Sequence, residues 1–320
     1  MSTAVDKTTA GSAPAGRRAK KAMSDRARGE QVLGWKLAGP AFVIMLAVTA
    51  YPILQATWTS FFKYRLTDPE NREFVFLNNY VTALKDAVFW QAIWVTVLIT
   101  IITVVVELVF GFIIAMVMHR VVIPRKTLRT VVLIPYSIIT VVSAFSWFYG
   151  FSVTTGYANH WLNFFTFGAF PADYNWFGGF WPSIAIICLS EIWKTTPFMS
   201  LLLLSGLAQV DSVMEEAAKV DGATFRQILF RVILPNMKPA IMVALLFRTL
   251  DAFRIFDNIF IMTGGANGTS SFSLLAYNQT ISRVEVGMGS ALSVLLFLCV
   301  VAIAFLFIKG FKVDLAEGRG

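Results

Sequence analysis

Six long apolar runs constrain the fold of this chain more than any other feature of its sequence. They cover residues 37–61, 90–118, 128–151, 181–207, 239–263 and 287–309. A helix crosses about 30 Å of hydrocarbon with about 20 residues, and each run is long enough. The composition agrees, because 57% of the residues are hydrophobic and 14% are charged, which is too apolar for an ordinary soluble domain. The sequence therefore predicts an all-α membrane protein with six transmembrane helices.

The basic residues are distributed unevenly among the segments that flank these runs. Residues 1–32 are strongly basic, and the connection between the second and third runs contains Arg120, Arg125 and Lys126 with no acidic residue. The segment 152–180 contains neither Lys nor Arg. Because Lys and Arg are retained on the cytoplasmic side of a membrane, we predict a multi-pass membrane protein with cytoplasmic N- and C-termini.

The same pattern divides the chain into parts. Residues 1–32 are predicted to form a disordered basic cytoplasmic tail, since no apolar segment interrupts them. Residues 33–312 are predicted to form the six-helix transmembrane domain, with a cytoplasmic connection at 208–238, and residues 313–320 a second cytoplasmic tail. The outer segment 152–180 is too aromatic for a free loop. It is predicted to contain an interfacial helix, with a docking surface for an extracytoplasmic partner as the alternative.

Several classes of function are disfavoured by the sequence. Cys188 and Cys299 both lie inside apolar runs, a placement that indicates neither a disulfide framework nor a metal site. The net charge of +8 is concentrated in the predicted cytoplasmic segments and does not indicate a nucleic-acid partner. No G-x-x-x-x-G-K-[ST] motif is present, so we do not expect this chain to hydrolyse ATP. No catalytic residue is predicted.

The cytoplasmic connection has an unusual spacing of small residues. Residues 215–239 read EEAAKVDGATFRQILFRVILPNMKP, in which Ala217, Ala218 and Gly222 leave one side of a short helix nearly flat. Gly222 permits a turn, and Pro235 cannot continue a helix without the loss of a hydrogen bond. The expected form is helix, turn, helix, with a surface on which another protein can lie closely.

Charged residues inside the fourth and fifth apolar runs are the second unusual feature. They are Glu191, Lys194, Arg248, Asp251, Arg254 and Asp257. Such charges cost at least about 2.5 kcal/mol each in a membrane and are expected to pair or to face water. Glu191 and Lys194 are three residues apart and can pair. We expect Arg248 and Asp251 to border a substrate route and Arg254 and Asp257 to brace the outer helix end; the alternative is that all six form structural ion pairs.

The cytoplasmic motif resembles that of a known family. It contains Glu216-Ala217-Ala218, then Gly222 four residues later, then Ile233-Leu234-Pro235 eleven to thirteen residues after the Gly. This spacing is similar to that of the EAA loop of the permease subunits of bacterial ABC importers. In that family the loop is a coupling helix that docks in a cleft of the ATPase subunit. The resemblance implies that coupling falls to Glu216, Ala217, Ala218, Asp221, Gly222, Leu234 and Pro235.

Other segments narrow the resemblance to carbohydrate importers. Residues 253–257 (FRIFD) with Thr263-Gly264-Gly265 resemble an element of the maltose-type permeases, and residues 190–207 and 239–260 are very similar to trehalose permeases. Two departures put the substrate contacts in doubt: Ala266 replaces the Pro of a GGP motif, and Thr195 replaces a Gly. The resemblance implies sugar-lining positions at Thr195, Phe198, Arg248, Asp251, Ala252 and Ile255. The predicted substrate pathway also includes Trp193 and Lys194, whose side chains in the same two spans are suited to sugar recognition.

The resemblance implies a type I ABC importer permease of a bacterial inner membrane, with defined partners. These are a second homologous permease, two ATP-binding subunits that hold ATP and Mg, an extracytoplasmic sugar-binding lipoprotein, and membrane lipid. The implied substrate is trehalose, with maltose or a glycerol phosphate ester as alternatives, and the implied mechanism is alternating access. Two other classes stay open: an ion-coupled secondary transporter that uses the intramembrane charges as a relay, and a non-transporting membrane scaffold or sensor subunit.

Overall fold

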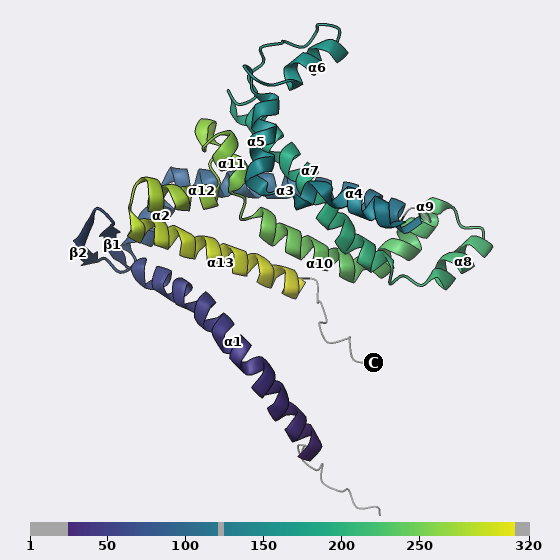
Figure 1. The fold of residues 1–320 in the computed structure, drawn as a ribbon, viewed down its shortest axis with the longest axis horizontal. Helices are drawn as coiled ribbons and strands as arrows, with labels where there is room; N and C mark the ends of the chain where they lie inside the picture. Colours follow the sequence, from purple (N-terminus) through teal and green to yellow (C-terminus); the bar gives the residue numbers. More distant parts are fainter. Residues whose placement is uncertain (1–24, 121–124, 311–320) are drawn as a thin grey trace, which may run out of the picture. The chain divides into compact units, whose positions relative to one another are not determined.

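The computed structural model describes residues 25–120 and 125–310, in which helices predominate (Figure 1). The predicted tail 313–320 and most of the predicted tail 1–32 lie outside the described residues, as do the side chains of Arg125 and Lys126. The first helix, α1 (Asp25–Thr59), begins earlier than the apolar run and includes the last residues of the predicted tail.

The chain divides into two compact units, residues 1–54 and 55–320. The first unit contains most of α1, whose large apolar side chains are exposed, including Trp35, Leu37 and Tyr51. None of its most apolar 18-residue window is buried. A helix that is apolar on all sides belongs in lipid or against another chain, so α1 agrees with the predicted first span.

The second unit contains all the other elements. In chain order they are β1 (Phe62–Arg65), β2 (Asp68–Phe74), α2 (Asn78–Lys85), α3 (Ala87–Arg120), α4 (Arg125–Ser137), α5 (Thr140–Phe151), α6 (Ala158–Phe165), α7 (Phe180–Leu207), α8 (Ser212–Val220), α9 (Phe225–Ile228), the π-helix η1 (Leu229–Ile233), α10 (Leu234–Ala252), α11 (Asp257–Met262), the 3₁₀-helix η2 (Ala266–Gly268), α12 (Phe272–Tyr277), the π-helix η3 (Asn278–Ser282) and α13 (Val286–Gly310). Strands β1 and β2 form an antiparallel hairpin.

The predicted all-α membrane architecture is confirmed. Among the described residues, five helices are long and apolar enough to cross a membrane, and α4 with α5 supplies a sixth span if this bent pair is counted as one. The pair is bent by 81°, close to Pro135, which cannot donate a backbone hydrogen bond. The third predicted span is therefore divided into two helices at a sharp bend.

The fifth predicted span, 239–263, is also interrupted, which the sequence did not predict. Helix α10 ends at Ala252 and α11 begins at Asp257. Backbone groups freed inside a membrane protein need partners within the protein. Here the buried Ser271 hydroxyl donates to the Ile255 carbonyl at 2.9 Å. The break is therefore stabilised by a residue from the loop that precedes α12.

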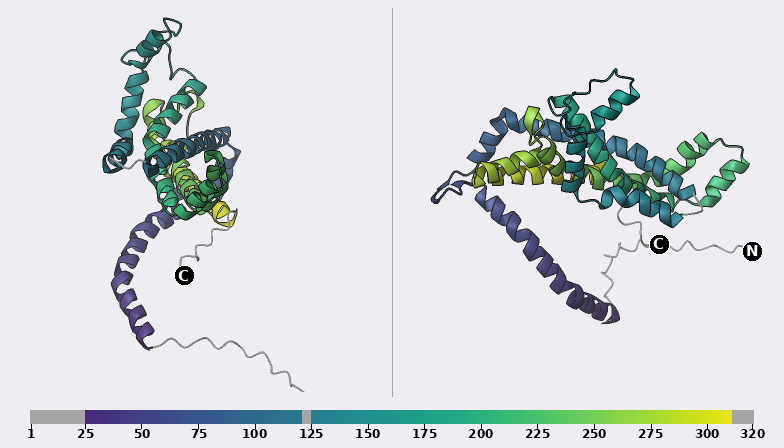
Figure 2. Two further views of the ribbon diagram at one scale, coloured as in Figure 1. Left: turned by 90° about the vertical axis from the view of Figure 1, so that its right-hand side faces the viewer. Right: turned by 45° about the horizontal axis from the view of Figure 1, so that its top comes forward.

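Helices α3, α7 and α10 lie side by side and form the centre of the second unit (Figures 1 and 2). Small residues permit the close approach: a Cβ added at Gly206 of α7 would collide with Ala240 of α10, and one at Gly111 of α3 would press on Met199 of α7. Because α3 and α7 run past each other over much of their length, any polar group on their facing sides is shielded from solvent.

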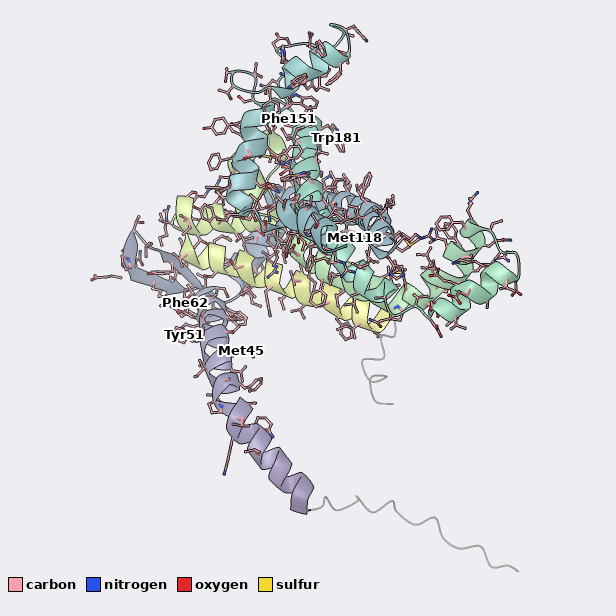
Figure 3. The ribbon with its side chains drawn as sticks, turned by 45° about the vertical axis from the view of Figure 1, so that its right-hand side comes forward. Met45, Tyr51, Phe62, Met118, Phe151 and Trp181 are labelled. Carbon is pink, nitrogen blue, oxygen red and sulfur yellow. The ribbon has the colours of Figure 1, made fainter. Side chains whose placement is uncertain are left out.

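Two of the three apolar clusters among the described residues of this unit lie at different levels along α3 and α7. The cluster nearer α5 and α11 contains Ile99 and Ile187, and the cluster nearer α9 contains Met118 and Leu203. Figure 3 shows Phe151 and Trp181 at neighbouring ends of α5 and α7, with Met118 farther along the bundle. Charged residues of α3, α7 and α10 occupy the level between the two clusters.

The segment 152–180 contains a helix, as predicted, namely α6. Trp161, Phe164 and Phe165 on this helix are exposed. The Asn159 amide links α6 to the following loop, because its Nδ2 donates to the Tyr174 carbonyl at 2.9 Å and its Oδ1 accepts from Trp176 Nε1 at 2.7 Å. An ordered aromatic helix is thus present where the sequence predicts an interfacial one.

Candidate functional site

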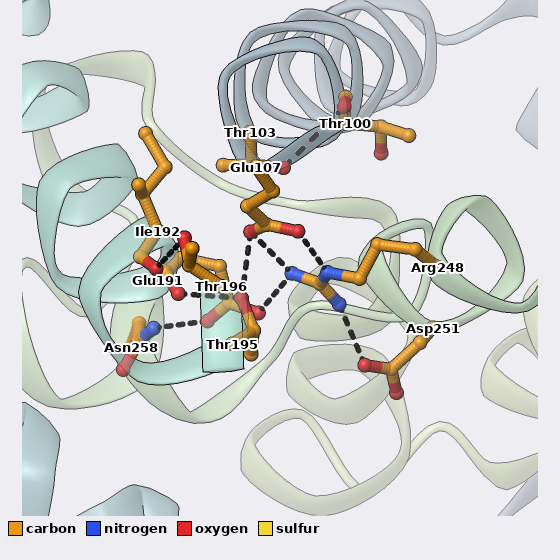
Figure 4. A network of polar contacts seen from close by, with 10 residues as sticks. All are labelled: Thr100, Thr103, Glu107, Glu191, Ile192, Thr195, Thr196, Arg248, Asp251 and Asn258. Atoms are coloured by element: carbon orange, nitrogen blue, oxygen red, sulfur yellow. Dashed lines mark hydrogen bonds and ion pairs between the residues drawn. The ribbon is translucent and has the colours of Figure 1, made fainter. Parts of the chain in front are cut away.

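Charged and polar side chains from four helices meet between the two apolar clusters (Figure 4). Helix α3 contributes Glu107, α7 contributes Glu191 and Thr195, α10 contributes Arg248 and Asp251, and α11 contributes Asn258. We call these six residues the buried network.

Arg248 is the centre of the buried network and is completely shielded from solvent. Its Nε and Nη2 bind the two carboxylate oxygens of Glu107, with Nη2 at 3.0 Å from Oε1. Nη2 also donates to Glu191 Oε1 at 2.7 Å, and Nη1 donates to Asp251 Oδ2 at 2.6 Å. One planar guanidinium therefore serves three carboxylates on three helices, a geometry that an ammonium group does not offer.

Glu107 is a member of the network that the sequence reasoning missed. It is fully buried, and the Thr195 hydroxyl oxygen lies 2.6 Å from its Oε1 and 2.6 Å from the Glu191 carbonyl oxygen. A signal was available, because Glu107 is the sole charged residue within the apolar run 90–118. A lone carboxylate at that depth requires a cationic partner, and Arg248 is that partner.

The predicted pair of Glu191 with Lys194 is not formed in the described part of the chain. Glu191 binds Arg248 instead, and its Oε2 accepts from Asn258 Nδ2 at 2.6 Å. The Lys194 ammonium lies 5.4 Å from the centroid of the Tyr136 ring, a distance typical of a cation–π contact. The reason is geometric: Arg248 approaches Glu191 across the helix interface, whereas Lys194 points toward α4.

A cavity of about 400 Å³ opens beside the network, a size within the range of about 300–1,000 Å³ that is usual for small-molecule sites. Its lining combines hydrogen-bond donors, acceptors and aromatic rings. The lining residues are Tyr136, Thr140, Glu191, Lys194, Thr195, Asp251, Arg254, Ile255, Phe256, Asp257 and Asn258. Such a surface is suited to a polar ligand with many hydroxyl groups.

Half of the predicted substrate-pathway residues line this cavity: Lys194, Thr195, Asp251 and Ile255. Arg248 does not, because its guanidinium is enclosed by the carboxylates of Glu107, Glu191 and Asp251. The Asp251 side chain is 58% exposed. Arg248 therefore faces the helix interface while Asp251, three residues later, faces the cavity.

The other three predicted pathway residues lie elsewhere. Ala252 is buried and is not part of the cavity lining. Phe198 stacks on Tyr136 with 5.1 Å between ring centroids, so it supports a cavity-lining residue from behind. Trp193 lines a separate cavity of about 450 Å³ and contacts Trp147 edge to face at 5.9 Å.

Arg254 and Asp257 also differ from expectation. They were predicted to brace the outer helix end as an ion pair, but within residues 25–120 and 125–310 neither forms one, and both line the cavity. The break between α10 and α11 explains this, because both residues lie at the break and not on a continuous helix face. Glu191, predicted to be a structural ion pair, is paired and also lines the cavity.

The motif at residues 215–239, which is predicted to be cytoplasmic, adopts the predicted helix, turn, helix form. Helix α8 begins after Asp211, whose Oδ1 accepts from Val213 N at 2.9 Å, a typical N-cap. The turn uses Gly222 with a φ of +78°, a conformation that favours glycine. The next helix begins at a capping box formed by Thr224 and Gln227.

Pro235 does not end the second helix, contrary to prediction. The chain continues from α9 through the π-helix η1 into α10, with Pro235 in the first turn of α10. A π-turn widens the hydrogen-bonding pattern and commonly accommodates an irregularity in a helix, here a residue without an N–H. The cytoplasmic motif is therefore directly continuous with the helix that bears Arg248.

The residues assigned to ATPase coupling lie on an open surface. No residue of α8 is buried. Exposed residues of the motif are Glu216, Ala217, Asp221, Gly222 and Pro235, and half-buried ones are Ala218 and Leu234. Two apolar side chains beside them, Val213 and Val220, are also exposed. This combination of exposed apolar and charged groups is characteristic of a protein interface.

Comparison with known proteins gives consistent results. Residues 107–311 match the family described as "Binding-protein-dependent transport system inner membrane component". The "Trehalose transport system permease protein SugA" of Mycobacterium tuberculosis (strain ATCC 25618 / H37Rv) is 49% identical over 282 residues, which cover 88% of this chain and 89% of that protein. The "Trehalose/maltose transport system permease protein MalF" of Thermococcus litoralis is 35% identical, with 88% and 94% covered.

A solved structure shares the fold. A chain in the "Crystal structure of a bacterial ABC transporter involved in the import of the acidic polysaccharide alginate" matches with a TM-score of 0.75 and 19% sequence identity, over 91% of this chain and 100% of that one. At this level of identity the match concerns the fold, and it agrees with the predicted permease architecture.

Proposed function

Because this chain belongs to the family of inner membrane components of binding-protein-dependent transport systems, we propose that it is the permease subunit of an ABC importer whose substrate is trehalose. Two relatives that are 49% and 35% identical are named as trehalose and trehalose/maltose permeases. The observation that carries the proposal is the polar cavity between α7, α10 and α11, held open beside a buried ionic network.

The charges of the cavity favour a neutral sugar over a phosphate ester. The ionisable residues of its lining are three acidic residues, Glu191, Asp251 and Asp257, and the basic residues Lys194 and Arg254. An excess of carboxylate repels an anionic ligand in a site of low dielectric constant. Trehalose has no charge, and its hydroxyl groups can both donate to carboxylates and accept from cationic groups. A glycerol phosphate ester is therefore the weaker candidate.

The family supports a complex with several partners. We propose that this chain pairs with a second homologous permease, two ATP-binding subunits and an extracytoplasmic sugar-binding lipoprotein. ATP and Mg are held by the ATP-binding subunits, and this chain binds no cofactor of its own. Both termini and α8 face the cytoplasm, an orientation supported by the basic residues at the end of α3 and beyond it.

The continuity of α9, η1 and α10, to which the turn at Gly222 joins α8, supports a mechanical link from ATP to sugar. We propose that α8 docks on an ATP-binding subunit through Glu216 and its small neighbours. Closure of the two ATP-binding subunits then displaces α8. Because Arg248 lies about 21 Å along the helix from Leu234 at about 1.5 Å per residue, the displacement reaches the buried network and the cavity, which opens alternately to the two sides.

The substrate assignment is tested by uptake of radiolabelled trehalose in cells that lack this chain, with and without a plasmid that restores it. Restored uptake, reduced by excess unlabelled trehalose more than by maltose, is the expected result. Deletion without loss of trehalose uptake contradicts the assignment. Uptake that an uncoupler abolishes and ATP depletion spares would support an ion-coupled transporter instead.

A further inference from the structure

The break between α10 and α11 is bridged by a single carboxylate of α7. Arg248 lies before the break and Asn258 after it. Glu191 accepts from Arg248 Nη2 through Oε1 at 2.7 Å and from Asn258 Nδ2 through Oε2 at 2.6 Å (Figure 4). The two sides of the interrupted span are thus held to the same residue of a neighbouring helix.

The chemistry of these groups fixes their orientation. A carboxylate can only accept hydrogen bonds, so the Asn258 amide must present its nitrogen to Glu191. The Asn258 oxygen points the other way and is buried, without a hydrogen-bond partner among the described residues. Neither polar atom of Asn258 is therefore available to a ligand in the cavity, and this residue can act on a ligand only through Glu191.

Glu107 has the equivalent position at the other end of the network. It is absent from the cavity lining and holds the Arg248 guanidinium through both oxygens. A bidentate contact fixes the plane of the guanidinium as well as its position. Because Arg248 then binds Glu191 with Nη2 and Asp251 with Nη1, its fixed plane determines the separation of two carboxylates that line the cavity.

We propose that Glu107 and Asn258 are positioning residues for the transported sugar. They hold Glu191 and Asp251 as hydroxyl acceptors at set places beside the break. This inference rests on the proposed function for the nature of the ligand. Asp251 is well placed for this role, since its Oδ1 accepts no hydrogen bond from any described residue and its side chain is largely exposed to the cavity.

A reciprocal exchange tests the Asn258 contact. In Asn258→Asp, two carboxylates face each other and the bridge is lost. In the double variant Glu191→Gln with Asn258→Asp, the glutamine amide donates to the new carboxylate while its oxygen still accepts from Arg248, so the bridge is restored with reversed polarity. A cycle of this kind isolates the interaction between two residues.

The measurement is trehalose uptake by the complete importer in proteoliposomes. For Asn258→Asp we expect the KM to rise roughly tenfold to hundredfold, as for small displacements of positioning groups, with an unchanged maximal rate and unchanged ATP hydrolysis without sugar. The double variant recovers most of the lost affinity. Asn71→Asp, an exposed position on β2, is the matched control and retains the wild-type KM.

Glu107 is tested in the same assay by Glu107→Gln, which keeps the shape of the side chain but weakens its hold on Arg248. We expect a raised KM and a nearly unchanged maximal rate. A lowered maximal rate at constant KM, for this variant or for Asn258→Asp, would indicate a merely structural role and overturn the proposal. A double variant no better than Asn258→Asp would overturn it as well.

A second readout needs no sugar and separates this inference from the substrate assignment. Spin labels at Phe247 and Ala266, both exposed and on opposite sides of the break, report its geometry after Cys188 and Cys299 are replaced by alanine. We expect a broad distance distribution for Asn258→Asp and a narrow one for wild type and for the double variant. Equal distributions in all three overturn the bridge. Absence of trehalose uptake by wild type refutes the substrate alone.

Discussion

The predicted cytoplasmic motif and the buried network both contain charged residues, but these residues are mostly exposed in the first region and mostly buried in the second. The motif occupies one short stretch, residues 211–235, and its side chains are mostly exposed. The network joins residues up to 141 positions apart, as in the pair of Glu107 and Arg248, and all its members except Asp251 are buried. The first region therefore offers free surface to another protein, and the second is satisfied within the chain.

This difference predicts how each region responds to substitution. Loss of a residue from a closed network leaves buried charges without partners, which destabilises the fold. Loss of an exposed docking residue removes an interaction with another subunit and leaves the fold intact. The network should thus control the stability of the permease and the geometry of its cavity, whereas the motif should control only the coupling to ATP hydrolysis.

The largest effect is expected for Arg248→Leu, because three carboxylates lose their shared cation. We expect a loss of about 3–5 kcal/mol in the free energy of unfolding, the usual cost of an unpaired buried charge, measured by thermal unfolding of the purified importer in detergent. Arg254→Leu is the matched control, since Arg254 is exposed and forms no ion pair with a described residue. Equal stabilities of the two variants would refute the central role of Arg248.

A smaller effect is expected for Glu107→Leu. Arg248 keeps Glu191 and Asp251 as partners, so the guanidinium is still neutralised. Its two hydrogen bonds to Glu107 are lost, whereas the Thr195 hydroxyl can still donate to the Glu191 carbonyl. The expected cost is about 2–3 kcal/mol, from roughly 1–1.5 kcal/mol for each hydrogen bond, in the same unfolding assay. A loss as large as that of Arg248→Leu would mean that the other two carboxylates contribute little.

In the predicted cytoplasmic motif, Gly222→Ala is expected to lower the free energy of unfolding by about 1 kcal/mol in the same unfolding assay, because a side chain is strained at a φ of +78°. There is open space around this position, so no collision adds to the strain. Gly34→Ala, which also meets no neighbouring atom but lies within a helix, is the control and should be neutral or stabilising. If both substitutions had the same effect, the turn would not depend on glycine.

Local patterns carried the successful predictions. The apolar spans are encoded by continuous runs, and the turn at Gly222 with the helix before it is encoded within a few residues. The helix at 152–180 was predictable from its aromatic residues alone.

The pairings within the network could not be derived in this way. Nothing in residues 188–198 indicates that Glu191 binds Arg248 rather than the nearer Lys194, since the choice depends on which helix face packs against α10. The break at 253–256 has neither Gly nor Pro to announce it, and Ser271, which satisfies its carbonyl, follows it by many residues. Glu107 alone had a local signal, its isolation in an apolar run.

The most direct test of the account compares Glu216→Ala with Asp251→Ala in the reconstituted importer, by trehalose uptake and ATP hydrolysis in the same proteoliposomes. The free energy of unfolding of Glu216→Ala should lie within about 0.5 kcal/mol of the wild-type value. This variant should nevertheless lose trehalose uptake and the dependence of ATP hydrolysis on sugar. Asp251→Ala should retain its ATP-binding subunits and require more trehalose for uptake. Wild-type transport by Glu216→Ala, or an Asp251→Ala complex that fails only to assemble, would contradict the account.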